Sequence, residues 1–294
     1  MKLSESELHT LHDVACEVAR QAGELIESYA DSVPEVQHKE GSESLATQVV
    51  TEVDFKCDAL IRGALQPTAD KYDLALLTEE TEDDGRRLTK DYFWCVDPLD
   101  GTLPFTRGLP GYGVSIALVE KSGKPVIGVA YDPREHILYS AISGRGARRN
   151  GQPWQPLEGE DRANSDRFTV PLDCSFVEQE DFAAIWASIE TWSIMHGYKG
   201  LNRIDDGGAV MSALWVLEQT PGCYFKQPKD QNGGGSVWDF AATACIFEEV
   251  GAIATDYAGE PFNFNPEGST YMNQCGVIFA SHDFFAKECL KEEH

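Results

Sequence analysis

The chain has 294 residues, with 24 Lys and Arg against 49 Asp and Glu, and a formal net charge of −25 at pH 7. This charge excludes binding to nucleic acid polymers or anionic membranes through a basic surface, because those partners attract clustered cations. A hydrophobic fraction of 42% is enough for a sizeable core, and the length predicts about two domains. We therefore expect a globular protein that binds any phosphate-bearing ligand locally.

Features that would indicate export or membrane insertion are not found. The first 20 residues contain no apolar signal core, and no apolar run approaches the roughly 18 residues that span a bilayer. The sequence predicts a soluble, cytoplasmic protein. The eight cysteines stand singly, without a CxxC pair, which predicts reduced thiols. His9 and His12 are expected to be solvated on an exposed helix rather than bound to metal.

The first half of the chain alternates helical and strand patterns. Ser4 and Glu7 form a capping-box signature before an apolar pattern with helical spacing, which predicts a helix of about 25 residues. The segment 49–60 is expected to enter a second helix. Short apolar runs predict buried strands at 74–77 and 93–96. Turns at regular intervals predict an antiparallel meander over 113–140.

The second half begins after turn-rich and polar sequence. The segment 144–156 is predicted to be a loop, because its glycines do not follow a strand and open a helix as a nucleotide-binding fingerprint requires. The polar linker 158–165 predicts a boundary between an N-terminal α+β domain, 1–157, and a C-terminal α/β domain, 158–294. In the latter we expect a helix at 181–190, apolar segments at 209–217 and 241–250, and a strand at 277–280.

A hexamer of unusual composition, from Asp97 to Thr102, directly follows the predicted strand at 93–96. Pro98 disfavours helix at Asp97, so the chain stays extended and then turns, which brings Asp97 and Asp100 toward one point. Two carboxylates in a partly buried strand end are unfavourable without a counter-charge such as a divalent metal. The amides of Gly101 and Thr102 can bind a phosphoryl oxygen if a helix or tight turn starts there.

Two further acidic positions could join this hexamer. Glu79 and Glu80 end the run at 74–77, and since successive side chains near a strand end alternate, one can face a shared site while the other faces solvent. Asp239 precedes a small-residue helical run, where a carboxylate can equally be a helix cap. Oxygen ligands without His or Cys select Mg²⁺ or Mn²⁺. Such ions activate water and clamp phosphate, which points to phosphoryl hydrolysis.

These residues resemble the lithium-sensitive, Mg²⁺-dependent phosphomonoesterases that include inositol monophosphatase and fructose-1,6-bisphosphatase. The segments 94–102 and 237–242 look like the first and second signatures of this family, and 51–54 and 78–80 match its weaker elements. The resemblance runs from about residue 8 to residue 282. It implies a layered α/β/α/β/α sandwich with the site between the two halves, and two or three Mg²⁺ ions.

Carried over position by position, the resemblance assigns roles to individual residues. It implies that the metal ligands are the carboxylates of Glu79, Asp97, Asp100 and Asp239 and the backbone carbonyl of Leu99. Asp54 would lie beside a further metal and, with the Thr102 hydroxyl, orient or deprotonate the attacking water. The amides of Gly101 and Thr102 would hold the phosphate.

The substrate is expected to be a small phosphorylated metabolite. The residue between the two aspartates and the segment 259–273 look most like the bacterial 3′-phosphoadenosine 5′-phosphate phosphatases, and Lys226 is a cation suited to a second phosphate. Leu103-Pro104, Ser212 and the insertion 228–235 depart from that subgroup. Inositol 1-phosphate and sugar phosphates are therefore alternative substrates within the same family.

Two alternative hypotheses about the function, outside the phosphatases, stay open. One is a catalytically silent regulator that binds metal or phosphate. The other is an acidic, soluble surface without a metal site. The expected oligomeric state is a monomer or a homodimer.

Overall fold

The computed structural model describes residues 2–29, 36–38, 49–158, 166–172, 174–177, 181–205 and 207–282. Its helices are α1 (Glu5–Glu27), α3 (Glu52–Tyr72), the short 3₁₀ helix η1 (Arg86–Leu88), α4 (Thr102–Thr106), α5 (Cys174–Val177), α6 (Phe182–Met195), α7 (Ala209–Glu218) and α8 (Val237–Glu249). Its strands are β1 (Val36–His38), β2 (Val49–Thr51), β3 (Ala75–Thr78), β4 (Tyr92–Asp100), β5 (Gly113–Glu120), β6 (Pro125–Asp132), β7 (Ile137–Ile142), β8 (Ala147–Arg149), β9 (Gln152–Trp154), β10 (Phe168–Pro171), β11 (Leu201–Ile204), β12 (Cys223–Lys226), β13 (Ile253–Thr255) and β14 (Val277–Ala280).

The start of α1 has the predicted capping box. The Ser4 amide donates to Glu7 Oε2 at 2.7 Å, and the Glu7 amide donates to Ser4 Oγ at 3.4 Å, so two of the free amides at the helix start are satisfied. The segment 49–60 enters a second helix, as predicted, after a short strand. Residues 49–51 form β2, as suits the β-branched sequence Val-Val-Thr, and α3 begins at Glu52.

The largest sheet has seven strands in the order β3-β4-β5-β6-β7-β8-β9. Only β3 and β4 are parallel, and the remaining pairs are antiparallel, which confirms the meander predicted over 113–140. A second group of strands contains the parallel pair β10–β11 and the antiparallel set β12-β14-β13, and a bridge between Thr169 and Gly222 connects them.

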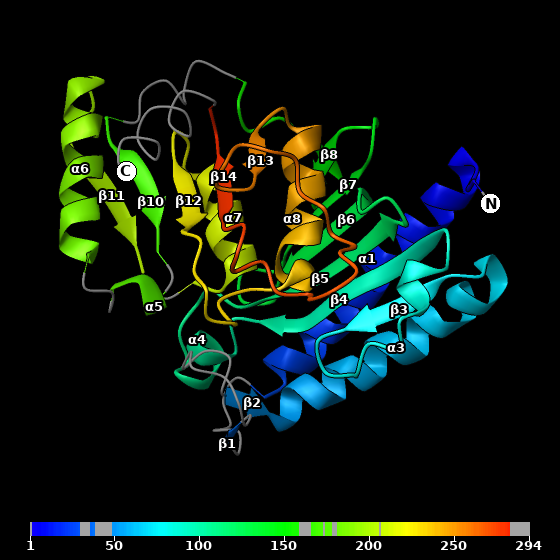
Figure 1. Cartoon of the computed structure of the whole chain (residues 1–294). Helices are drawn as coiled ribbons and strands as arrows, with labels where there is room; N and C mark the ends of the chain where they lie inside the picture. Colours follow the sequence, from blue (N-terminus) through cyan, green and yellow to red (C-terminus); the bar gives the residue numbers. More distant parts are fainter. Residues whose placement is uncertain are drawn as a thin grey trace.

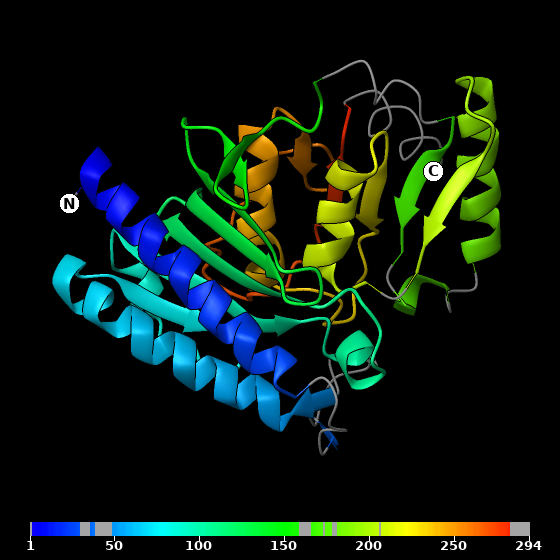
Figure 2. The same ribbon diagram turned by 180° about the vertical axis from the view of Figure 1, so that it is seen from behind.

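Helices and sheets alternate in five layers (Figure 1). The helices α1 and α3 pack on one face of the seven-stranded sheet, and α7 and α8 lie on its other face. The strands β10–β14 follow, and α5 and α6 pack against their far side. The reverse view shows α1 and α3 crossing the first face side by side (Figure 2). This arrangement confirms the α/β/α/β/α sandwich.

The prediction of a loop over 144–156 was wrong. Residues 147–149 and 152–154 form the hairpin β8–β9, which extends the seven-stranded sheet. Its two-residue turn is Asn150-Gly151, and both residues have positive φ, 49° and 77°. Asn-Gly is the preferred sequence of such tight hairpin turns, so the signal was present in the sequence.

The predicted linker 158–165 lies outside the described residues except for Glu158, and the two-domain division stays a prediction. One apolar core contains residues of both halves of the chain, from Ala75 on β3 to Phe279 on β14. Among the described residues, none of the helices has the length and apolar character that crossing a membrane requires. Six of the cysteines, Cys16, Cys57, Cys95, Cys223, Cys245 and Cys275, are free thiols, and all of these but Cys275 are buried.

The side chain of Arg87 connects the segment after β3 to the C-terminal half of the chain. It is 2% exposed, and its Nε donates to Asp83 Oδ2 at 2.7 Å. Its Nη1 donates to Asn265 Oδ1 at 2.7 Å and to the backbone oxygen of Pro266 at 2.8 Å. Since every one of these acceptors lies in a partly or fully buried site, the guanidinium fixes two distant segments together.

We expect Arg87→Met to lower the free energy of unfolding by about 3–5 kcal/mol, because it removes one partner of a buried ion pair and leaves its acceptors unsatisfied. Urea denaturation measures the change. Arg86→Met is the matched control: Arg86 is 56% exposed and pairs with Asp84, so its loss should cost less than about 1 kcal/mol. Equal losses in the two variants would contradict the assigned role of Arg87.

Candidate metal centre

The strand β4 determines where its acidic end points. All nine of its residues are buried, and its side chains alternate between two cores: Phe93 and Cys95 face α7 and α8, whereas Trp94 and Val96 face α1 and α3. Asp97 continues the first series, so its carboxylate points to the face that α8 covers.

Glu79 reaches the same face from the neighbouring strand. Ala75 and Leu77 of β3 belong to the core beneath α8, and Glu79 continues their alternation. Its amide donates to the backbone oxygen of Val96 at 3.2 Å, which keeps it in line with β4. The structure thus selects Glu79, and not Glu80, as the carboxylate that faces the shared site.

Asp239 comes to this site from the first turn of α8. One carboxylate oxygen of each of Glu79, Asp97 and Asp239 lies within 4.8 Å of the other two. Asp239 Oδ2 also accepts a hydrogen bond from the Ser236 amide at 2.7 Å, so Asp239 acts as a helix cap and as a member of the carboxylate group. We call Glu79, Asp97 and Asp239 the carboxylate triad.

The triad is electrostatically unfavourable without a cation. Asp97 is 1% exposed, and burial, followed by the charges of Glu79 and Asp239, raises its pKa well above the usual value. Burial also raises the pKa of Asp239 to about 6, and the charge of Glu79 adds to the shift. Oxygen ligands in this number and spacing fit a hard divalent cation such as Mg²⁺, which would neutralise the repulsion.

Asp100 is adjacent to the triad but has other partners in this structure. Its Oδ1 accepts from the Ala209 amide at 3.0 Å and its Oδ2 from the Val210 amide at 2.8 Å, so the carboxylate caps the N-terminus of α7. A Cβ at Gly208 would lie 2.3 Å from Asp100 Oδ2, which explains the glycine there. Sequence reasoning missed this contact, although the Gly-Gly pair directly before α7 was its signal.

The residues predicted to position water lie together. Thr102 Oγ1 is 3.1 Å from Asp54 Oδ1 and 3.2 Å from the backbone oxygen of Leu99, so the hydroxyl can donate to either oxygen. Asp54 is 3% exposed in the first turn of α3. Gly101 has φ 82°, and a Cβ there would lie 2.7 Å from the Gly111 oxygen, so the turn into α4 requires glycine.

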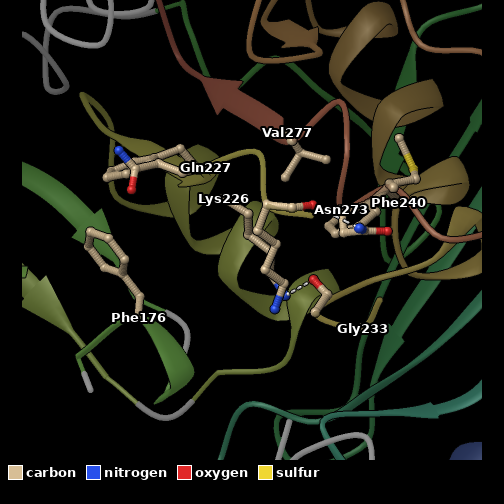
Figure 3. A pocket seen from close by; sticks show the side chains of 12 residues that line it. Phe176, Lys226, Gln227, Gly233, Phe240, Asn273 and Val277 are labelled. Atoms are coloured by element: carbon tan, nitrogen blue, oxygen red, sulfur yellow. Dashed lines mark hydrogen bonds between the residues drawn. The ribbon is translucent and has the colours of Figure 1, made fainter. Parts of the chain in front are cut away.

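Burial raises the pKa of Asp100 and of Asp239, and the charge of Lys226, at the end of β12, partly offsets the rise in both. The Nζ of Lys226 donates to the backbone oxygen of Gly234 at 2.6 Å. Figure 3 shows this side chain extending toward the glycine segment, in a pocket that Phe176, Gln227 and Asn273 also line. Gly233 to Gly235 have φ of 110°, 81° and 133°, conformations that favour glycine, and they belong to the predicted insertion.

One predicted site feature was wrong. His12 is 9% exposed instead of solvated, because it lies on the buried face of α1, where Cys16 Sγ, one turn later, is 3.6 Å from its Nε2. Burial lowers the pKa of His12. His9 is exposed, as expected, and its side chain is 50% accessible.

The pH dependence of the metal-free protein follows from the raised pKa values. Folded Asp97, Asp100 and Asp239 hold protons that the unfolded chain loses near its ordinary pKa of 3.8. The free energy of unfolding contributed by these groups therefore falls as pH rises from about 4 through about 6, the pKa of Asp239. Thermal unfolding in EDTA should show this fall, and Mg²⁺ should reduce it. An identical pH profile with and without Mg²⁺ would contradict this account.

Comparison with known proteins places the chain in a family. It matches the inositol monophosphatase family over residues 7–293 and belongs to that family. It is 30% identical over 289 residues to Nus factor SuhB of Vibrio cholerae, covering 93% of this chain and 92% of that protein. It is 40% identical over 265 residues to inositol monophosphatase 2 of Solanum lycopersicum, covering 85% and 89%. The family and these relatives support a phosphatase.

The solved structures show the same fold. The IMPase of Thermotoga maritima superimposes with a TM-score of 0.70 at 24% sequence identity, covering 95% of this chain and 94% of that one. The sandwich and its central mixed sheet are therefore those of the inositol monophosphatase fold.

Proposed function

We propose that the chain is a Mg²⁺-dependent phosphomonoesterase acting on a small phosphorylated metabolite. The observation that carries the proposal is the carboxylate triad. Near it, the Thr102 hydroxyl lies within hydrogen-bond distance of Asp54 and of the backbone oxygen of Leu99. Membership of the inositol monophosphatase family supports the same class of reaction.

The triad carboxylates of Glu79, Asp97 and Asp239 would hold Mg²⁺, with Asp100 and the Leu99 carbonyl completing the set for two or three ions. When bound, such ions neutralise phosphate charge and lower the pKa of a water molecule. The fit rests on the crowding of the triad: burial and the charge of Glu79 raise the pKa of both Asp97 and Asp239, and a divalent cation would relieve this repulsion.

The remaining steps belong to the chain's own groups. Asp54, which accepts a hydrogen bond from Thr102 in this structure, would orient the attacking water through the threonine hydroxyl and take up its proton. The amides of Gly101 and Thr102, at the turn into α4, would donate to the phosphoryl oxygens and stabilise the charge that develops during in-line attack. Catalysis on this account combines positioning with electrostatic stabilisation.

Within this class we propose 3′-phosphoadenosine 5′-phosphate as the substrate, with hydrolysis to AMP and phosphate. The support is Lys226: its charge acts on Asp100 and Asp239 of the acidic centre, and an ammonium group in that position suits a second phosphate. SaIMPase-II, a protein of the same fold, has been solved with bound 2′AMP.

A second candidate is inositol 1-phosphate. It is favoured by the 40% identity to a tomato protein named inositol monophosphatase 2, and SaIMPase-II has also been solved with bound inositol monophosphate. A non-catalytic regulator is the third candidate, since a relative at 30% identity is named a Nus factor. Phosphate release from both esters with Mg²⁺ distinguishes the three candidates. Turnover of either ester excludes a non-catalytic regulator, and the ester with the higher kcat/KM is the preferred substrate.

We expect Lys226→Gln to raise the KM for 3′-phosphoadenosine 5′-phosphate at least about tenfold, because a charge-assisted hydrogen bond contributes roughly 1.5–3 kcal/mol. The KM for inositol 1-phosphate, which has no second phosphate, should change less than about threefold. Lys229→Gln is the matched control, since Lys229 lines the same pocket. Steady-state kinetics give the result, and an equal change for both substrates would count against the nucleotide.

A further inference from the structure

A second hollow lies between α1 and the strands β7 and β8, and none of the carboxylate triad lines it. It has a volume of about 470 Å³ and is lined by α1 from His9 to Arg20, by most of β7, and by the segment from Arg145 to Gly151 that contains β8. Figures 1 and 2 both show α1 running from its labelled N-terminus beside β7 and β8 to its other end near β2 and α4. The hollow therefore does not belong to the carboxylate site.

Six residues with acidic or basic side chains line this hollow, and three of them are arginines, in a chain whose net charge is −25. They are His9, His12, Asp13, Arg20, Arg145 and Arg148. Asp13 is the only acidic residue among them, and its side chain is 80% exposed. Such a local concentration of arginine in an acidic protein indicates a site for an anion.

Two of the arginines retain free donors. Within the part of the chain that the structure describes, neither Arg20 nor Arg148 forms a salt bridge, and Arg148 uses one Nη1 donor on the Gly151 carbonyl at 3.0 Å. Arg145 Nη2 lies 2.7 Å from Glu5 Oε2 at the rim. Two guanidinium groups are thus available for the bidentate contacts that bind phosphate.

The loop that carries Arg145 is fixed by Glu249, the last residue of α8. The amides of Gly144, Arg145 and Gly146 donate to the carboxylate of Glu249 at 2.6, 2.9 and 2.6 Å. Three backbone donors on one carboxylate fix the loop before β8, and preorganised groups lose less entropy when a ligand binds. The hollow is therefore a formed site on a fixed loop.

The rest of the lining includes apolar side chains beside Ser140. Leu138, Ala141 and Ile142 contribute to it, and its volume lies within the range of about 300–1,000 Å³ that small-molecule sites occupy. A ligand with an anionic group and an apolar or planar body would match both parts of this surface.

We propose that this hollow is an accessory binding site for a small organic phosphate, separate from the metal centre. The phosphate contacts Arg20 and Arg148, and the organic body lies on the apolar wall of β7. The inference is independent of the catalytic proposal, because it rests on a different cavity and requires no divalent metal.

Isothermal titration calorimetry with phenyl phosphate in EDTA tests the proposal. The wild-type protein should bind phenyl phosphate, more tightly than inorganic phosphate, and should not bind phenol. Arg20→Ala/Arg148→Ala should weaken binding at least tenfold. The matched control is Arg62→Ala/Arg86→Ala, which removes two exposed arginines that pair with Asp58 and Asp84 elsewhere on the surface and should leave binding unchanged.

Absence of phenyl phosphate binding to the wild-type protein in EDTA would overturn the proposal, as would equal affinity in the two double variants. Circular dichroism and the urea midpoint confirm that each variant is folded. Phosphate release with Mg²⁺ is measured separately, so failure of the accessory site and failure of the proposed phosphatase are distinguishable.

Discussion

Asp97→Asn is expected to lower the turnover of the best phosphomonoester by at least about a thousandfold. Asp97 is the buried centre of the carboxylate triad, and its loss weakens the site for the ion whose charge stabilisation contributes several kcal/mol to the transition state. The same change should raise the melting temperature of the metal-free protein, because it removes a carboxylate whose pKa is raised by burial and by Glu79.

A lower turnover together with a higher melting temperature of the metal-free protein is the result expected for a metal ligand. Differential scanning calorimetry should show that Mg²⁺ raises the melting temperature of the wild-type protein and has a much smaller effect on the variant. Glu80→Gln is the matched control, since Glu80 neighbours Glu79 but lies outside the triad. Wild-type activity and an unchanged Mg²⁺ response in Asp97→Asn would disprove the assignment.

Asp54→Asn is expected to lower kcat about 10²–10⁴-fold with little change in KM, because it removes the group proposed to take up the proton of water. Thr102→Val should lower kcat as well, since it removes the hydroxyl that lies 3.1 Å from Asp54 Oδ1. Because the two residues act as one unit, the double variant should be little worse than Asp54→Asn alone.

The control for the Asp54 and Thr102 variants is a measurement of Mg²⁺ binding. Asp54 and Thr102 are outside the triad, so both variants should keep the increase in melting temperature that Mg²⁺ produces. Losses of kcat that multiply in the double variant would show two independent roles, and an unchanged kcat in Asp54→Asn would exclude a role in water activation.

The site near β4 was predictable because its chemistry is local. Strand, proline, paired aspartates and glycine are adjacent in the sequence, and the structure has Asp97 and Asp100 at the end of a buried strand with Gly101 at positive φ. The alternation of side chains predicted that one of Glu79 and Glu80 faces the site, but not which. That depends on the pairing of β3 with β4, and hence on which face α8 covers.

Contacts between distant segments could not be predicted from local patterns. The amides that hold Asp100 come from α7, more than a hundred residues away, and the hollow beside α1 forms where β7 and β8 lie next to this helix. His12 lies on the buried face of α1 with Leu11 and Ala15, so its helical spacing indicated burial although its polar side chain was expected to be solvated. The hairpin β8–β9 was missed for another reason: its Asn-Gly turn was treated as part of a loop.

The most direct test of the central claim is phosphate release from 3′-phosphoadenosine 5′-phosphate and inositol 1-phosphate, measured with Mg²⁺, with EDTA, and with EDTA followed by excess Mg²⁺. The carboxylate triad predicts turnover of at least one ester with Mg²⁺, its loss in EDTA and its recovery when Mg²⁺ is restored. An unchanged rate in EDTA, or no release from either ester by protein that binds Mg²⁺, would contradict a metal-dependent phosphomonoesterase.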